Sequence, residues 1–135
     1  TDYIPFKNKN KIKVFKKKIS VSKEFNLKKF IFNSSIAMST VIIRRSILKN
    51  IKFKKLKICE DYLFKCEMLK ENNAFKCENA LMFYRILKNS LQSNKIRNIY
   101  WVWYINKKYN KLNFYNNLMS LVLISINSIK KYGFK

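Results

Sequence analysis

The chain has 135 residues, 48% of them hydrophobic and 16% aromatic, which suffices for one domain with a hydrophobic core and excludes a disordered tail. It has no histidine and one glycine, which excludes a Ser-His-Asp triad, a Cys-His nucleophile pair and a glycine-rich phosphate loop. The 30 lysines and arginines against 7 acids give a formal charge of +23, typical of proteins that bind nucleic acid or anionic membranes.

Arginine is scarce among these cations, with only four residues in the chain. Because the forked arginine side chain is the preferred ligand of phosphate and guanine, a nucleic-acid partner is not favoured. Asparagine occurs 17 times beside frequent Lys, Ile, Phe and Tyr, which is typical of an AT-rich genome. We therefore interpret most of the charge as composition on solvated faces. A basic surface that holds the protein near acidic lipid headgroups stays open as the alternative.

The cysteines and the apolar segments indicate the compartment. Cys59, Cys66 and Cys77 are odd in number and fit no common zinc pattern, so we expect buried thiols in a reducing environment. The longest apolar stretches, Ile99–Ile105 and Leu118–Ile126, fall short of the roughly 18 residues that span a bilayer. Without a signal peptide, we expect a cytoplasmic protein, with peripheral contact at the inner membrane face left open.

The N-terminal region 1–23 alternates loosely between apolar residues and lysines. Ile12 and Val14 share one face, which predicts an edge strand or an exposed hairpin guarded by lysines. Ser22 can then cap a short helix that runs to about Phe32.

The middle of the chain combines a strand pattern with the clearest helix. Residues 39–44 form a short β-branched run that ends in charge, which predicts a buried strand. Residues 45–50 predict one helical turn, and residues 52–57 a basic loop. Residues 60–71 predict a helix, because apolar side chains share one stripe and two acids in the first turn favour its positive end.

Two short strands are expected at 74–77 and 81–87. The order of strands and helices predicts an α/β unit, a short mixed sheet followed by C-terminal helices. No repeat and no Pro/Gly/Ser linker divides the chain, so residues 1–135 are expected to form a single unit.

The last third of the chain predicts two helices with asparagine or serine caps. Ser93 or Asn94 can cap a helix that runs to about Tyr109. Asn113 or a neighbour can cap a last helix that runs to about Lys131.

Acids are few, and only Glu60 and Asp61 are adjacent. A carboxylate at a helix start can accept a proton from a substrate hydroxyl, which makes this pair a candidate for general-base catalysis. Acids in a first helical turn also stabilise the helix by roughly 0.3–1 kcal/mol each, so a purely structural role stays open on these two residues alone.

Four segments follow one another in the order Ser39–Leu48, Glu60-Asp61-Tyr62, Leu81–Arg85 and Asn89–Lys95. Together they resemble the second half of bacterial family 2 glycosyltransferases. In that family a Ser/Thr-rich strand runs into a basic turn, a Glu-Asp pair opens a helix, and a Tyr-Arg strand and a Ser-x-Ser segment precede C-terminal helices. The order and spacing of the segments match from about Thr1 to Gly133.

The resemblance implies a partial GT-A-like unit of an enzyme that moves a sugar, with inversion, from a nucleotide-sugar donor to a glycan or lipid-linked acceptor. Lipopolysaccharide or capsule synthesis would be its setting. It implies that Asp61 is the general base and that Glu60 orients the site or hydrogen-bonds the acceptor. Arg85 would lie near the diphosphate, and Ser39 and Thr40 would line the pocket near the donor sugar. Arg85 as a surface cation, and the Ser-Thr pair as the polar end of a strand, stay open.

The family's first half carries an Asp-x-Asp motif that binds the diphosphate through a divalent metal, Mg or Mn, and no such motif is present here. We therefore expect an acceptor-side half without the N-terminal nucleotide-binding half, with no metal bound by this chain alone and no activity by itself. A non-catalytic basic module that binds nucleic acid or anionic membrane, and an inactive glycosyltransferase remnant, are the alternatives.

Overall fold

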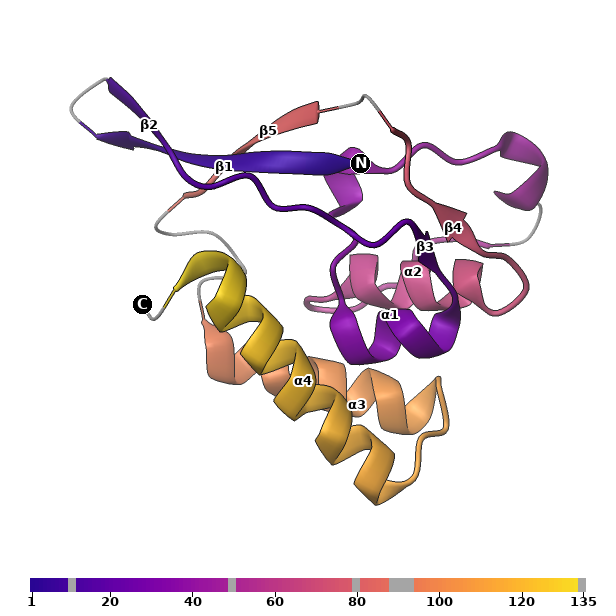
Figure 1. The fold of residues 1–135 in the computed structure, drawn as a ribbon. Helices are drawn as coiled ribbons and strands as arrows, with labels where there is room; N and C mark the ends of the chain where they lie inside the picture. Colours follow the sequence, from indigo (N-terminus) through magenta and orange to yellow (C-terminus); the bar gives the residue numbers. More distant parts are fainter. Residues whose placement is uncertain (10–11, 49–50, 79–80, 88–93, 134–135) are drawn as a thin grey trace.

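The computed structural model describes residues 1–9, 12–48, 51–78, 81–87 and 94–133. The strands are β1 (Asp2–Lys9), β2 (Ile12–Phe15), β3 (Glu24–Phe25), β4 (Ala74–Phe75) and β5 (Leu81–Arg85). The helices are α1 (Leu27–Asn33), α2 (Glu60–Leu69), α3 (Lys95–Lys108) and α4 (Phe114–Tyr132), with 3-10 turns η1 (Met38–Thr40) and η2 (Arg45–Leu48). Figure 1 shows the main sheet on one side of α1 and α2, and the α3–α4 hairpin on the other. The predicted α/β class is confirmed.

The main sheet has the order β2-β1-β5 and is mixed, as predicted. β1 pairs antiparallel with β2, which confirms the hairpin expected near the N-terminus. β1 also pairs parallel with β5, from Asp2 opposite Leu81 to Phe6 opposite Arg85. The connection between these two parallel strands contains α1, α2 and the small β3–β4 sheet.

The first helix starts later than the sequence predicts, so the Ser22 cap is wrong. Asn26 is the cap instead, and its side-chain oxygen accepts a hydrogen bond from the N–H of Lys29 at 2.8 Å. The reason is the β3–β4 pairing, which holds Glu24 and Phe25 extended and delays the helix until the next residue able to cap it.

The buried strand predicted at residues 39–44 is also wrong. Met38–Thr40 is a 3-10 turn, and both the N–H and the hydroxyl of Thr40 donate to the carbonyl of Ala37, at 2.9 and 2.8 Å. Threonine hydroxyls compete with a strand ladder in this way. Ile42 is 95% exposed, so the β-branched run does not enter the core.

The remaining elements agree with the predictions except at their ends. The turn at 45–50 is confirmed over Arg45–Leu48, the loop at 52–57 is confirmed, and α2 ends two residues before the expected position. Both strands of the next pair are shorter than predicted. Asn94 and Asn113 cap α3 and α4, and Gly133 follows α4 with a φ of 76°. Ser93 and residues 49–50 lie outside the described residues.

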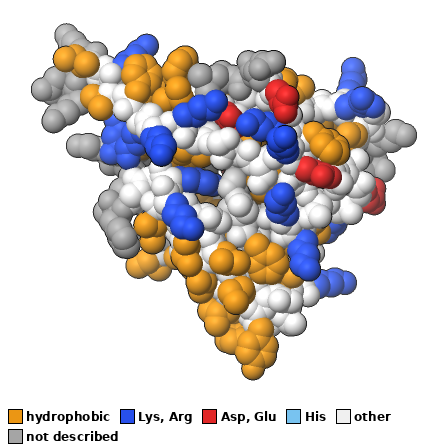
Figure 2. Space-filling view, viewed as in Figure 1, with side chains coloured by type: hydrophobic (Ala, Val, Ile, Leu, Met, Phe, Trp, Pro, Cys, Tyr) orange, Lys and Arg blue, Asp and Glu red, His pale blue; other side chains and the backbone are white. Residues whose placement is uncertain are grey.

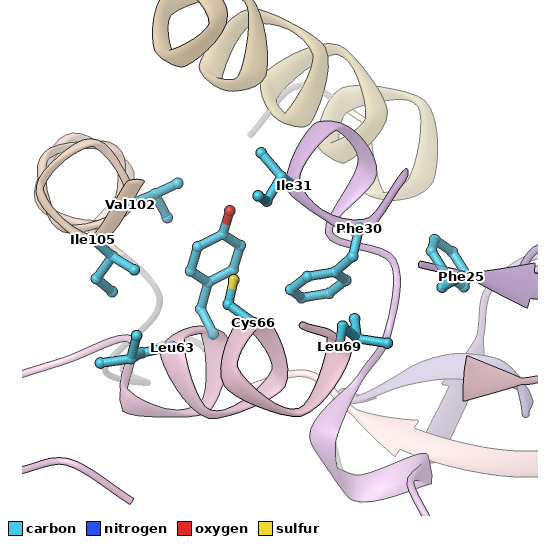
Figure 3. Packing of buried hydrophobic residues seen from close by; sticks show 9 residues of the cluster. Phe25, Phe30, Ile31, Leu63, Cys66, Leu69, Val102 and Ile105 are labelled. Atoms are coloured by element: carbon cyan, nitrogen blue, oxygen red, sulfur yellow. The ribbon is translucent and has the colours of Figure 1, made fainter. Parts of the chain in front are cut away.

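The hydrophobic core lies between the helices rather than under the main sheet. Figure 3 shows apolar side chains from α1, α2 and α3 that point toward one another. The members of this cluster are Phe25, Phe30, Ile31, Tyr62, Leu63, Cys66, Leu69, Val102 and Ile105. The expected burial of the cysteines is therefore confirmed for Cys66, but Cys77 is exposed and the prediction is wrong there.

A polar network runs through this core with Asn106 of α3 at its centre. Asn106 is fully buried, accepts a hydrogen bond from the hydroxyl of Tyr62 at 3.0 Å and donates to Ser120 at 3.1 Å. Ser120 in turn donates to the carbonyl of Ile31 at 2.8 Å. These bonds join all four helices, and buried polar groups satisfied in this way stabilise one packing arrangement.

The two C-terminal helices form an antiparallel hairpin that packs on α1. In the part of the chain that the structure describes, neither these nor any other helix combines the length and the apolar character needed to cross a membrane.

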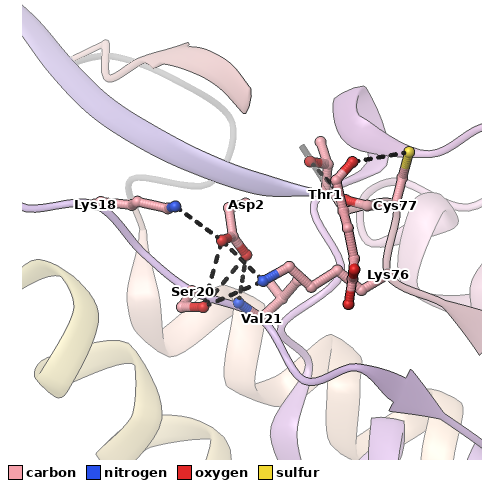
Figure 4. A network of polar contacts seen from close by, with 8 residues as sticks. Thr1, Asp2, Lys18, Ser20, Val21, Lys76 and Cys77 are labelled. Atoms are coloured by element: carbon pink, nitrogen blue, oxygen red, sulfur yellow. Dashed lines mark hydrogen bonds and ion pairs between the residues drawn. The ribbon is translucent and has the colours of Figure 1, made fainter. Parts of the chain in front are cut away.

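A second polar network anchors the start of β1 (Figure 4). The buried carboxylate of Asp2 accepts hydrogen bonds from the N–H of Val21 at 3.0 Å and from Lys76 at 2.9 Å, and pairs with Lys18 at 3.2 Å. Burial alone would raise the pKa of Asp2, but the hydrogen bonds from Lys76, Val21 and Lys18 outweigh it and hold that pKa well below its usual range. Asp2 therefore ties the sheet to the β3–β4 region.

Replacing Asn106 with leucine should lower the free energy of unfolding by about 2–4 kcal/mol, because the Tyr62 hydroxyl and Ser120 lose a buried partner. Urea denaturation followed by circular dichroism measures the change. The same substitution at the exposed Asn116 of α4 is the matched control and should shift stability by less than about 0.5 kcal/mol. Equal stability of the two variants would contradict the central role of Asn106.

Candidate functional site

The start of α2 places the Glu60-Asp61 pair. Cys59, just before the helix, adopts a left-handed conformation with a φ of 62°, and its carbonyl accepts hydrogen bonds from the N–H groups of Tyr62 and Leu63. The chain therefore turns sharply from the preceding loop into the helix, with both acids in its first turn. Glu60 is exposed, whereas the side chain of Asp61 is only 27% exposed.

Lys65 fixes the orientation of the Asp61 carboxylate. Its ammonium group lies 3.0 Å from Oδ2 of Asp61, one helical turn away, and also donates to the carbonyl of Ile36 at 2.9 Å. The side chain of Lys65 is 9% exposed, so this ion pair is screened less than a surface pair. The contact joins α2 to the segment that follows α1.

Asp61 faces an open cavity of about 690 Å³ lined by β1, β5, the segment after α1, and helices α2, α3 and α4. Hydroxyl groups and lysines line much of this cavity. The hydroxyl side chains are Tyr3, Ser34, Ser35, Ser39, Tyr62, Tyr84, Ser125, Ser128 and Tyr132, and the lysines are Lys65, Lys95 and Lys131. Asp61 is the sole carboxylate among the described lining residues, so the charged side chains of the wall sum to a net positive charge.

Lys131, near the end of α4, is the most unusual of these cations. It donates a hydrogen bond to the buried Ser35, and no carboxylate pairs with it among the residues that the structure describes. Burial lowers the pKa of Lys131 to about 8, so the ammonium form still predominates at neutral pH. A cation held in this way favours a ligand that brings negative charge into the cavity.

Three other titratable groups of the cavity wall, Cys59, Tyr3 and Tyr132, are poor proton acceptors. Burial, and next the charges of Asp61 and Glu60, raise the pKa of the Cys59 thiol to about 11. The hydroxyls of Tyr3 and Tyr132 are 2.9 Å apart, and burial raises the pKa of both. At neutral pH these three groups stay protonated, which leaves the Asp61 carboxylate as the wall's candidate base.

The structure brings only part of the predicted site together. Asp61 and Ser39 both line the cavity. Thr40 turns its hydroxyl to a backbone carbonyl, Glu60 is exposed outside the wall, and Arg85 is exposed at the end of β5, where its neighbour Tyr84 faces the cavity. Segment 89–95 of the resemblance lies mostly outside the described residues.

Three residues that line the cavity were not predicted from the sequence. Lys65 stands four residues after Asp61 in a predicted helix, and this spacing, typical of an ion pair, could have indicated it. Ser35 and Lys131 meet only through the packing of α4 on α1, and one lysine among so many carries no sequence signal.

The described residues do not fit a divalent metal ion. No group of three cysteine, aspartate or glutamate side chains gathers anywhere in the described part of the chain. Oδ2 of Asp61 already pairs with Lys65, and the cavity wall offers no second carboxylate among its described residues.

The fold and the site together define an α/β protein with a cationic, hydroxyl-lined cavity around one carboxylate. The chain is similar to an uncharacterized glycosyltransferase of Haemophilus influenzae, with 29% identity over 118 residues. The match covers 86% of this chain and 47% of that protein, so the chain spans about half the length of the curated relative it matches. No family model matches the chain, and no solved structure matches it. The similarity supports a glycosyltransferase relationship.

The free energy of unfolding of the wild-type chain, relative to a Lys131→Met variant, should rise from about pH 7 to about pH 9. Burial lowers the pKa of Lys131 in the folded chain, so the unfolded chain binds more protons in this range and stability increases with pH. We expect a rise of about 1 kcal/mol, allowing for solvent screening of a partly exposed group. Urea denaturation at each pH measures it.

Lys130→Met, which removes an exposed cation from the same turn, is the control. A difference between wild type and Lys131→Met that stays constant over this pH range would contradict the burial of the ammonium group.

Proposed function

We propose that residues 1–135 form the acceptor-side half of an inverting glycosyltransferase with a GT-A-like fold, in which Asp61 is the general base. The observation that carries the proposal is the position of Asp61, the sole described carboxylate in the wall of a hydroxyl-lined cavity. Similarity to a protein named as a glycosyltransferase supports the same class of reaction.

In this reaction the acceptor hydroxyl attacks the anomeric carbon of a nucleotide sugar. A new carbon–oxygen bond forms, the bond to the nucleoside diphosphate breaks on the opposite face, and the configuration inverts. The hydroxyl proton passes to the Asp61 carboxylate, which later releases it to water. Lys65 holds that carboxylate in one orientation, and a positioned base of this kind contributes about 10²–10⁴-fold to the rate.

The positive cavity fits a substrate that carries phosphate groups. Lys131 and Lys95 lie in the same wall as Asp61 and would offset the charge that develops on the leaving diphosphate. Ser35 and Ser39 would hydrogen-bond sugar hydroxyls. We keep Glu60 as a contact to the acceptor outside the cavity wall.

Arg85 and Thr40 keep the roles that the resemblance implies for them. Arg85, next to the cavity-lining Tyr84, would contact the diphosphate, and Thr40 would help Ser39 shape the donor-sugar end. Both assignments need a movement of the side chain, because Arg85 is exposed and the Thr40 hydroxyl is bound to a backbone carbonyl.

The donor nucleotide and a divalent metal would be bound elsewhere in a longer protein, because this chain spans about half the length of its relative. A glycan or lipid-linked acceptor made on the cytoplasmic side, for lipopolysaccharide or capsule, would then meet the donor at the Asp61 cavity.

In the complete protein that the gene encodes, Asp61→Asn should lower kcat for sugar transfer by about 10²–10⁴-fold, because the amide cannot accept the proton. Release of the nucleoside diphosphate from a panel of nucleotide sugars, with lipid-linked acceptors, measures transfer. Binding of the nucleotide sugar should stay within about twofold, since the variant keeps the size and shape of the side chain.

Glu60→Gln is the matched control, because it makes the same chemical change one residue away on an exposed side chain. We expect it to lower kcat by less than about tenfold. Unchanged turnover of Asp61→Asn would remove Asp61 as the base.

A further inference from the structure

Helix α4 turns buried polar side chains inward beside Leu121 and Ile124, and it carries a line of apolar side chains on its outer side. Asn117 and Ser120 are 1% and 0% exposed and donate to the carbonyls of Trp103 and Ile31. The opposite side carries Tyr115, Met119, Val122, Ile126 and Ile129, with exposures of 80%, 54%, 44%, 41% and 38%, and Ile129 also lines the Asp61 cavity. These five residues, the α4 stripe, recur every three or four positions and so form one line along the helix. In soluble helices an apolar stripe of this kind normally faces the core.

The α4 stripe is part of a larger apolar surface. Phe114, Leu118 and Leu123 flank it on the same helix, with exposures of 63%, 46% and 36%. Figure 2 shows apolar side chains as a continuous band over the lower part of the molecule, where Figure 1 places α4. A helix of 19 residues is about 28 Å long, and a contiguous apolar band of that length marks an interaction surface.

The charges around the α4 stripe are all of one sign. The sequence contains no aspartate or glutamate after Glu78. Lys107, Lys108 and Lys111 are exposed at the turn where α4 begins, and Lys130 is exposed in its last turn. An apolar face with lysines at both ends complements an anionic lipid surface, where the apolar side chains enter the acyl boundary and the lysines meet phosphates.

The same charge disfavours a second copy of this chain as the partner. Two molecules that each carry a formal charge of +23 repel one another, and no acidic residue of α3 or α4 is available to offset that repulsion. Trp103 adds to the lipid interpretation, because its ring packs against Phe114 at 5.6 Å beside the start of the stripe. Tryptophan is enriched at membrane interfaces.

We propose that α4 docks this protein on an anionic membrane, with the helix axis parallel to the surface and the α4 stripe inserted between the headgroups. The inward side of α4, which includes Ser125, Ser128 and Lys131, forms one wall of the Asp61 cavity. The cavity therefore lies about one helix diameter, roughly 10 Å, from the lipid surface. This docking goes beyond sugar transfer and does not depend on it.

Cosedimentation with vesicles tests the docking. The wild-type chain should bind vesicles of phosphatidylcholine mixed with phosphatidylglycerol and should bind phosphatidylcholine vesicles at least about tenfold more weakly. The double variant Val122→Glu/Ile126→Glu should lose at least about tenfold in affinity for the mixed vesicles, because two inserted side chains become charged. Both positions are partly exposed, so the variant should keep the circular dichroism spectrum of the wild type.

Ile42→Glu/Phe75→Glu is the matched control. It makes the same change in net charge at apolar residues that are 95% and 74% exposed and lie outside α4. We expect it to bind the mixed vesicles within about twofold of the wild type. If both double variants bind equally, net charge alone drives the contact and the proposal is wrong. Absence of wild-type binding, or equal binding to both kinds of vesicle, would overturn it as well.

A second set of measurements separates lipid from protein partners. Lipids brominated near the headgroup should quench the fluorescence of Trp103 when vesicles are added, and absence of quenching would count against insertion. Analytical ultracentrifugation without lipid should show a monomer. A dimer that Val122→Glu/Ile126→Glu dissociates would assign the stripe to a second copy, and loss of vesicle binding in the complete protein would assign it to another part of that protein. Either result overturns the proposal.

Discussion

The hydrogen bonds of one buried side chain, Asn106, constrain how the four helices pack. An amide enclosed in an apolar core is costly unless its groups find partners, and here the partners come from α2 and α4. Ser120 must face inward to meet Asn106, which turns the apolar side of α4 to the surface. The same rotation of α4 brings Lys131 against Ser35 at the cavity. The unusual outer face and the cationic wall thus have a common origin in the core.

Lys65 connects the two segments that form the candidate site, helix α2 and the segment after α1. This residue binds Asp61 on its own helix and the carbonyl of Ile36, which lies in the segment that carries Ser35 and Ser39. The acid and the serines are therefore positioned by one cation, and Lys131 joins the same segment from the other side. A site assembled from β1, β5 and three helices in this way depends on the complete packing of the chain, with no short loop able to form it alone.

Local sequence patterns were sufficient to predict those elements whose structure depends mainly on their own residues. The helical stripes and the Asn94 and Asn113 caps placed α2, α3 and α4, and the acid pair was correctly put at the start of α2. The β-branched run around Ile42 led to the wrong prediction of a buried strand, because the burial of a segment depends on which other segments pack against it, and a local pattern does not contain that information. The meeting of Ser35 with Lys131, far apart in the chain, required the packing of α4 on α1.

The parallel pairing of β1 with β5 has a consequence for how the chain is made. On the ribosome, the β1–β2 hairpin can close as soon as it emerges. The pairing of β1 with β5 forms only later, because Asp2 pairs with Leu81, which is made much later. At synthesis rates of roughly 5–20 residues per second that interval is on the order of ten seconds, during which one edge of β1 presents unpaired backbone groups. Unpaired edges attract the edges of other chains. The lysines along the nascent hairpin, such as Lys7, Lys13 and Lys16, would keep neighbouring nascent chains apart until the partner strand arrives.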